Sequence, residues 1–168
     1  MLQHVKKLLF LASLFILCGF PWTTFDWDYV NKSIDKKYPF VASISTQSLK
    51  KKMGQRQALT IIDVRDAKEF KVSHLPEASN VKDARAIDLP LDTTIIVYCS
   101  VGLRSASFAK KLTGRGYSNV FNLRGSIFEW ANKGLPLRRG DQVVKVVHPY
   151  NKKWGRLVKE SLHAYHAD

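Results

Sequence analysis

The chain has 168 residues, 45% of them hydrophobic, and a formal net charge of +13. The length suffices for one domain with a core of its own, and the hydrophobic share is ordinary for a globular protein. The sequence holds two cysteines, Cys18 and Cys99. Because Cys18 falls in an N-terminal leader, the domain keeps a single thiol, which excludes a disulfide framework.

The positive charge lies in the flanks of the chain. Residues 1–57 carry nine Lys or Arg and three Asp or Glu, and residues 131–168 carry eight and three. The residues between them are nearly balanced. Basic flanks favour an anionic partner, either a membrane surface or a small anion that is steered to the site. Nucleic acid is not expected as a partner, because no recognition motif or zinc pattern accompanies the charge.

Residues 1–25 are predicted to be a signal peptide or a membrane anchor. Lys6 and Lys7 precede an apolar run of 13 residues from Leu8 to Phe20. This run is shorter than the roughly 20 residues of a spanning helix but is typical of a signal peptide. An uncleaved anchor needs the following residues as well, and a buried N-terminal helix is the remaining alternative. The lysines predict that the domain lies outside the cytoplasm, as an exported, periplasmic or membrane-anchored protein.

After this leader the chain alternates predicted strands with predicted helices. Residues 26–42 are expected to form a linker or a strap that packs on the domain. A short strand at 43–46 precedes a helix at 47–54, and a buried strand covers 58–64. The pattern predicts a single α/β domain at residues 43–138, with a mostly parallel sheet and helices on both faces.

Charged residues follow the strand at 58–64. Asp63 and Arg65 lie at its carboxyl end, the edge at which open α/β sheets bind ligands. One interpretation makes them supporting residues that brace an active loop. The other interpretation pairs Arg65 with Glu69 on the surface of the next helix. For Glu69 we favour this surface pair. His74 is interpreted as a structural turn residue rather than a general base.

One loop organises the chain. The run 94–98 predicts a buried strand, Cys99 follows it directly, and a helix with its polar start at Ser105 comes next. Backbone N–H groups in such a loop form a nest for an anion, and the helix dipole reinforces the field. We therefore expect a lowered thiol pKa at Cys99. Arg104 adds a positive charge that can pair with an oxyanion, and Gly102 permits backbone geometry that a side chain resists.

The residues of this loop form the predicted site. Cys99 is the predicted nucleophile, although a free cysteine at a strand end is often only a small buried hydrophobe. Asp63 and Arg65 are the predicted supporting residues, and no metal ligand set is predicted. The predicted substrate-binding residues are Ser100, Val101, Gly102, Leu103, Arg104 and Ser105.

The rest of the chain carries further candidates. Arg124 follows a predicted strand at 120–123 and is either a second anion-binding group or a solvated turn residue, and Trp130 is expected in the core. Residues 139–168 are predicted to be a basic C-terminal extension with an edge strand at 143–147 and an amphipathic helix. We favour packing of this helix on the domain over binding to a membrane surface. Its apolar stripe consists of Trp154, Leu157, Val158, Leu162 and Tyr165.

A set of motifs occurs in order over residues 43–138: Ile62–Arg65, Glu69-Phe70, His74–Ala78, Val97–Cys99 with its loop, Ser105-Ala106, Gly116–Val120, Leu123–Ser126, Trp130 and Gly134–Leu137. In kind and order these motifs resemble single-domain rhodaneses, the sulfurtransferase family. Two departures concern turn geometry. Ser73 and Glu77 stand around the His-Leu-Pro element where the family usually has glycine, and Ser126 stands where a second glycine is usual.

The resemblance implies an enzyme that moves sulfane sulfur from a small anionic donor, such as thiosulfate, to a thiophilic acceptor through a Cys99 persulfide. Cyanide or a protein thiol is the expected acceptor, and no cofactor is implied. A non-catalytic rhodanese-like binding or sulfur-carrier module is one alternative. A cysteine phosphatase is another, but such enzymes use a Cys-x5-Arg loop, whereas Cys99 and Arg104 have the Cys-x4-Arg spacing, which suits a single sulfur.

Overall fold

The computed structural model describes residues 25–167. The predicted signal peptide or membrane anchor at residues 1–25 lies outside the described residues, apart from Phe25. Between residues 25 and 167, no helix has both the length and the apolar character that crossing a membrane requires.

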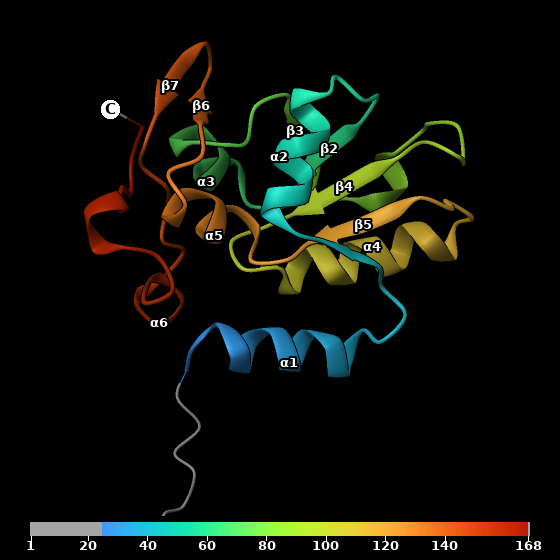
Figure 1. Ribbon diagram of the computed structural model, residues 1–168, viewed down its shortest axis with the longest axis horizontal. Coiled ribbons are helices and arrows are strands. Elements are labelled where there is room, and N and C mark those ends of the chain that lie inside the picture. The colour runs from blue at the N-terminus through green and yellow to red at the C-terminus, as the bar shows by residue number, and fades with distance from the viewer. Residues whose placement is uncertain (1–24, 168) are drawn as a thin grey trace, which may run out of the picture.

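A five-stranded parallel sheet forms the centre of the domain, with the strand order β1-β5-β4-β2-β3 (Figure 1). Its strands are β1 (Ser43–Ile44), β2 (Thr60–Asp63), β3 (Ala78–Asn80), β4 (Ile95–Tyr98) and β5 (Val120–Leu123). β4 lies in the middle and is buried along its whole length, as expected for a strand that is covered on both faces. The predicted α/β fold with a mostly parallel sheet is confirmed.

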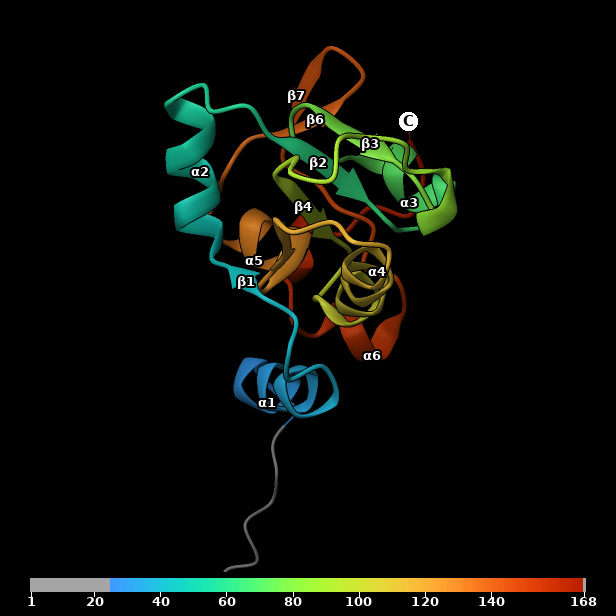
Figure 2. The same cartoon turned by 90° about the vertical axis from the view of Figure 1, so that its right-hand side faces the viewer.

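Helices cover both faces of this sheet. Figure 2 shows α4 on one face and α2 with α5 on the other. The helices are α1 (Trp27–Lys37), α2 (Thr46–Gly54), α3 (Ala67–Val72), α4 (Leu103–Gly114), α5 (Ser126–Asn132) and α6 (Lys152–Gly155), with 3-10 turns η1 (Ala84–Ala86) and η2 (Glu160–Leu162).

Alternating side chains of β2 and β4 build the two cores. Ile61 and Ile96 lie in the core shared with α2 and α5, whereas Ile62 and Val97 lie in the core shared with α4. This follows from strand geometry, because successive side chains point to opposite faces. The parallel pairing also brings the carboxyl ends of β2 and β4 to one edge, where Cys99 directly follows β4.

Residues 26–42, predicted as a linker or strap, contain the helix α1. The Asp26 side chain accepts a hydrogen bond from the Tyr29 N–H at 2.9 Å and caps the helix. Val30 and Ile34 are one helical turn apart, and both are buried in the core. The segment therefore contains a helix that packs on the domain, which agrees with the strap rather than the linker of the two predicted alternatives.

An antiparallel hairpin joins the domain to the C-terminal extension. β6 (Leu137–Arg139) pairs with β7 (Gln142–Val144) in a sheet of their own, and one bridge joins Arg138 to His74. The edge strand predicted at 143–147 therefore ends earlier than expected and belongs to this hairpin rather than to the central sheet.

The amphipathic helix predicted further on is wrong as a continuous element. The structure has the short helix α6, which ends at Gly155, and then the separate turn η2. Asn132 interrupts the helical pattern, because its Nδ2 donates to Leu157 O at 2.8 Å and its Oδ1 accepts from the Lys159 N–H at 2.9 Å. Those backbone groups are thereby satisfied outside a helix. Leu157 and Val158 are buried, so the segment still packs on the domain.

Candidate active site

The loop after β4 turns the chain sharply into α4. Gly102 caps this helix and takes a left-handed φ of +112°. A side chain at this position would be strained by the backbone conformation, and its Cβ would lie 3.2 Å from Ile34 Cδ1, which would have to shift. The helix begins at Leu103, earlier than the polar start predicted at Ser105.

Cys99 is a buried thiol that the loop surrounds. Its exposed fraction is 1%, and its Sγ accepts a hydrogen bond from the Gly102 N–H at 3.2 Å. The Ser105 hydroxyl lies 3.6 Å from Sγ. Burial raises the pKa of Cys99, but the charge of Arg104 and the hydrogen bonds from Ser105 and Gly102 outweigh it, so this pKa lies below its ordinary value. The direction agrees with the expectation from the sequence.

Asn122 fastens the loop to β5. Its Nδ2 donates to Gly102 O at 3.1 Å, and its Oδ1 accepts from the Ser105 hydroxyl at 2.6 Å. The hydroxyl of Ser105 is thereby positioned between Asn122 and the Cys99 thiol. Sequence reasoning missed Asn122 as a site residue. The signal that could have found it is an amide in the middle of an otherwise apolar strand, because a buried amide needs polar partners.

Ser126 holds the backbone of Cys99. Its Oγ accepts a hydrogen bond from the Cys99 N–H at 3.2 Å and donates to Leu123 O at 3.0 Å. Ser126 keeps a left-handed φ of +48°, a conformation that favours glycine. The serine that departs from the family pattern thus retains the turn, and its two hydrogen bonds offset the backbone strain.

Glu69 and Arg104 form an ion pair beside Cys99. The Arg104 Nη1 and Nη2 donate to Glu69 Oε2 and Oε1 at 2.8 and 2.9 Å, and the Ser100 hydroxyl donates to Oε1 at 3.1 Å. Burial raises the pKa of Glu69, but Arg104 outweighs it and holds this pKa below its usual value. The predicted surface pair of Arg65 and Glu69 is wrong, because Glu69 is fully buried and binds Arg104 instead.

This ion pair changes the expected role of Arg104. The sequence predicts that its planar fork orients the oxyanion of a donor, whereas the structure gives that fork to Glu69. Ser100 is likewise turned to Glu69 and to Arg104 Nη2, which lies 2.9 Å from its Oγ. What Arg104 supplies to Cys99 in this arrangement is its positive charge.

Asp63 and Arg65 form a second ion pair, fully buried at the end of β2. The Arg65 Nη2 lies 2.6 Å from Asp63 Oδ2 and donates to Ser73 O at 2.6 Å. Asn80 Nδ2 donates to the backbone O of both Asp63 and Arg65 at 2.9 Å. The pair therefore braces the loop that follows α3, and the Arg65 guanidinium also lies over the ring of Tyr98, the residue before Cys99, with 5.8 Å from Cζ to the centroid.

Two other candidates have structural roles. The His74 N–H donates to Arg138 O at 2.9 Å, and its ring stacks on Phe70 with 4.2 Å between centroids, which agrees with a structural turn histidine. Arg124 pairs with Asp35 of α1 at 2.8 Å. Arg124 therefore fastens α1 to the end of β5 and does not act as a second anion-binding group beside Cys99.

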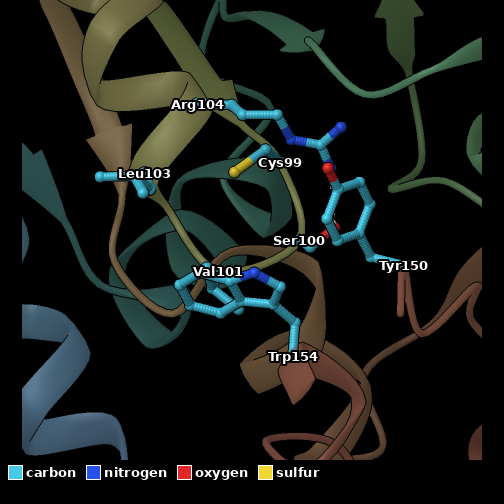
Figure 3. A pocket seen from close by; sticks show the side chains of 7 residues that line it. All are labelled: Cys99, Ser100, Val101, Leu103, Arg104, Tyr150 and Trp154. Carbon is cyan, nitrogen blue, oxygen red and sulfur yellow. Dashed lines mark hydrogen bonds between the residues drawn. The ribbon is translucent and has the colours of Figure 1, made fainter. Parts of the chain in front are cut away.

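A cavity of about 120 Å³ lies beside Cys99. Its walls come from the active loop and from two aromatic side chains of the C-terminal extension, Tyr150 and Trp154 (Figure 3). The centroid of the Tyr150 ring lies 4.6 Å from Cζ of Arg104. Sequence reasoning placed Trp154 on a helical stripe and passed over Tyr150, because no local pattern connects either residue to a loop so far back along the chain.

The site residues together offer nucleophilic sulfur chemistry. They supply a thiol of lowered pKa, hydrogen-bond donors at its sulfur and a neighbouring cation. These groups define a class of α/β proteins that have a reactive cysteine in an anion-binding loop. Over residues 25–167, no group of three or more His, Cys, Asp or Glu side chains could hold a metal ion.

Comparison with known proteins identifies the family. The model of the rhodanese-like domain matches residues 45–133, more than half of the chain, and the protein belongs to this family. A sulfurtransferase of Allochromatium vinosum is 31% identical over 101 residues, which are 58% of this chain and 94% of that protein. The thiosulfate sulfurtransferase GlpE of Pseudomonas savastanoi pv. phaseolicola is 31% identical over 80 residues, 45% of this chain and 76% of that protein.

Solved structures agree with this assignment. A rhodanese-related protein from Thermoplasma volcanium is 26% identical and aligns with a TM-score of 0.52 over 58% of this chain and 98% of its own. Some of the curated relatives are longer proteins, of which this chain spans about a quarter. The family match ends at residue 133, so Tyr150 and Trp154 of the cavity lie outside the matched domain.

Proposed function

We propose that the protein is a sulfurtransferase that carries sulfane sulfur from a small anionic donor, such as thiosulfate, to a thiophilic acceptor through a persulfide on Cys99. The observation that carries this proposal is the Cys99 thiol, which has a lowered pKa and accepts a hydrogen bond from the Gly102 N–H at 3.2 Å. Membership of the rhodanese-like family supports it, and thiosulfate is named for one of the relatives.

Transfer would proceed in two displacement steps. The Cys99 thiolate attacks the outer sulfur of thiosulfate, the Sγ–S bond forms as the S–S bond of the donor breaks, and sulfite leaves with the bonding electron pair. The acceptor, cyanide or a thiolate, then attacks the outer sulfur of the persulfide, and Cys99 leaves as thiolate. With cyanide the product is thiocyanate, and the two steps consume no oxidant.

The loop supplies what the intermediate needs. A persulfide anion carries negative charge on its outer sulfur, so it gains from hydrogen-bond donors and positive potential that are already in place. The Gly102 N–H, the N-terminus of α4 and the charge of Arg104 meet this requirement. The same groups favour the thiolate before the donor arrives.

Intact-mass measurement of the full chain before and after treatment with thiosulfate tests the proposal. We expect a gain of one sulfur atom that cyanide reverses with release of thiocyanate. The gain should be absent in Cys99→Ser and retained in Cys18→Ser, which removes the other thiol. Failure of the wild type to gain sulfur from thiosulfate and from an organic persulfide would overturn the catalytic proposal and leave a rhodanese-like binding or carrier module.

The phosphatase alternative has its own readout. Hydrolysis of an aryl phosphate by the wild type that disappears in Cys99→Ser would favour phosphoryl transfer. We expect no such activity, because the fork of Arg104 is bound to Glu69 and is not presented to a phosphoryl group.

We also propose that the domain works outside the cytoplasm, exported to the periplasm or anchored at a membrane whose anionic surface attracts the basic flanks. Lys6 and Lys7 ahead of the apolar run Leu8 to Phe20 support this location. Fractionation of bacteria that produce the full chain tests it, with Leu11→Arg/Leu14→Arg as the control that interrupts the run. Recovery of both chains in the cytoplasmic fraction would contradict the proposal.

A further inference from the structure

The C-terminal extension covers the Cys99 site with two aromatic side chains. Tyr150 and Trp154 line the cavity together with Leu103 and Arg104 of the active loop (Figure 3). Both aromatic residues follow the family domain, whose match ends at residue 133. They form the side of the cavity that faces the active loop, and they therefore help to decide which molecules reach the thiol.

Specific contacts hold these aromatic residues in place. The Tyr150 N–H donates to His148 Nδ1 at 3.0 Å, and Tyr150 keeps a left-handed φ of +64°. The Asn151 Oδ1 accepts from the Trp154 N–H at 3.0 Å, and the Phe25 ring packs edge-on against Trp154 with 5.2 Å between centroids. Left-handed backbone in a residue other than glycine is strained, and such strain is concentrated at functional sites.

The positively charged guanidinium of Arg104, beside Cys99, already has partners. Arg104 is the charged side chain among the residues that line the cavity. Its terminal nitrogens bind Glu69 at 2.8 and 2.9 Å, and the Tyr150 ring covers its guanidinium with 4.6 Å between Cζ and the ring centroid. A dianion such as thiosulfate must lose strong hydration to enter the cavity, and the fork of Arg104 that would pair with its oxygens is already bound to Glu69.

The rest of the cavity suits an apolar group. Val101, Leu103 and the two aromatic rings form most of the remaining lining. An apolar or aryl substituent on a donor would bury its surface against them, which is favourable in water. The volume of about 120 Å³ is close to that of the apolar cavity of about 150 Å³ that holds benzene in an engineered protein.

We propose that Tyr150 and Trp154 are specificity-determining residues that make Cys99 prefer a singly charged organic sulfane donor with an apolar substituent over the thiosulfate dianion. This inference rests on the proposed function, since it presumes that Cys99 accepts sulfur. It assigns the choice of donor to the C-terminal extension, whereas the chemistry of transfer belongs to the active loop.

Organic thiosulfonates are the matched probes for this preference. In R–SO2–S⁻ an organic group replaces one oxygen of thiosulfate and removes one negative charge. The Cys99 thiolate attacks the outer sulfur, the S–S bond of the donor breaks, and a sulfinate leaves with the bonding electron pair in place of sulfite. Reaction with each donor yields the same Cys99 persulfide, so the rates can be compared by measuring the formation of that one product.

The experiment measures the rate of persulfide formation on the full chain with benzenethiosulfonate, methanethiosulfonate and thiosulfate. We expect the wild type to favour benzenethiosulfonate over thiosulfate by about tenfold or more, with methanethiosulfonate between them. Because the donors also differ in intrinsic reactivity, the decisive quantity is the change in this ratio on mutation. It should fall at least about fivefold in Trp154→Ala and in Tyr150→Ala, and Trp154→Phe should restore most of it.

Two variants outside the cavity serve as controls. Phe40→Ala removes an aromatic ring that is 97% exposed, and Lys152→Ala changes an exposed residue of α6; both should keep the wild-type ratio. If an alanine variant does not fold, as judged by circular dichroism, Trp154→Leu and Tyr150→Leu replace it, and the ratio should fall in them as well. An unchanged ratio in the folded alanine or leucine variants, or a preference of the wild type for thiosulfate, would overturn this inference alone. Absence of persulfide from every donor would overturn the proposed function with it.

Discussion

Glu69 and Arg104 are 35 positions apart in the chain and form a two-pronged ion pair, with N–O distances of 2.8 and 2.9 Å. The pair ties α3 to the first turn of α4 and so joins two loops at the carboxyl edge of the sheet. Glu69 is fully buried, while about a third of the Arg104 side chain is exposed. The arrangement lets Glu69 act on the Cys99 thiol through the charge of Arg104.

Replacement of Glu69 should lower the pKa of Cys99 further. In Glu69→Gln, Arg104 keeps its charge but loses the carboxylate that offsets it, so the thiolate is favoured more strongly. The rate of Cys99 alkylation by iodoacetamide as a function of pH measures this pKa. Arg104→Met should shift the pKa in the opposite direction. Glu160→Gln, at an exposed position, is the matched control. A Cys99 pKa that stays the same in Glu69→Gln would show that the two charges do not act in this way.

The lowered pKa of Cys99 also predicts how stability depends on pH. The unfolded thiol keeps its proton up to its ordinary pKa of about 8.5, whereas the folded thiol releases it at lower pH. Between these two values the unfolded state binds more protons, so the free energy of unfolding rises with pH. The contribution is complete above the unfolded pKa and is lost as the pH falls through the folded pKa.

Urea unfolding of the wild type and of Cys99→Ser at a series of pH values checks this sign. The difference in unfolding free energy, wild type minus variant, should increase from about pH 6 to about pH 9. The Cys18→Ser variant should follow the wild type. A difference that decreases with pH would mean that the folded thiol has a raised pKa.

Gly102→Ala should disturb both stability and sulfur loading. The residue holds a φ of +112°, and a Cβ would lie 3.2 Å from Ile34 Cδ1. We expect a loss of about 1–2 kcal/mol in the free energy of unfolding, measured in urea. Persulfide formation should also slow, because the Gly102 N–H that binds Cys99 Sγ moves with the loop. Gly114→Ala is the matched control at the other end of α4, where nothing lies within 4 Å, and it should leave the stability equal or slightly higher.

Asp63→Asn should be among the most destabilising substitutions in the protein. It leaves the guanidinium of Arg65 fully buried without its counter-charge. Loss of one partner of a buried ion pair costs about 3–5 kcal/mol, which urea unfolding can measure. Asp83→Asn removes a carboxylate from the exposed pair with Arg85 and should change the unfolding midpoint very little. Equal effects of the two substitutions would contradict this account of the Asp63–Arg65 pair.

The sequence predicts much of the fold because the decisive patterns are local. A buried strand, a cysteine, a glycine and a helix start follow one another around Cys99, and their geometry needs no distant information. The alternation of strands and helices along the chain is also a local pattern, and it predicts a parallel sheet with helices on both faces. The exact start of α4 is harder to predict from the sequence, since Gly102 rather than Ser105 caps the helix.

The missed features depend on contacts between distant parts of the chain. Glu69 has helical spacing from Arg65, which favours a surface pair, but its actual partner is Arg104 on another helix. Tyr150 carries no local signal for its contact with Arg104. The C-terminal helical stripe is broken by Asn132, whose side chain takes up the backbone of Leu157 and Lys159. A single sequence shows none of these three relationships, because each is decided by tertiary packing.

The order of the chain has a consequence for a newly made molecule. Tyr150 and Trp154 are synthesised after the five strands of the central sheet and after α4, and domains can begin to fold during synthesis from the N-terminal side. The loop can therefore generate a Cys99 thiolate before the aromatic residues have docked beside it. During that interval the sulfur is more exposed to oxidants and to thiol reagents than in the finished protein, where Tyr150 and Trp154 line its cavity. The rate at which Tyr150 and Trp154 dock beside the loop therefore affects the fraction of molecules whose Cys99 thiol is still unmodified when folding is complete.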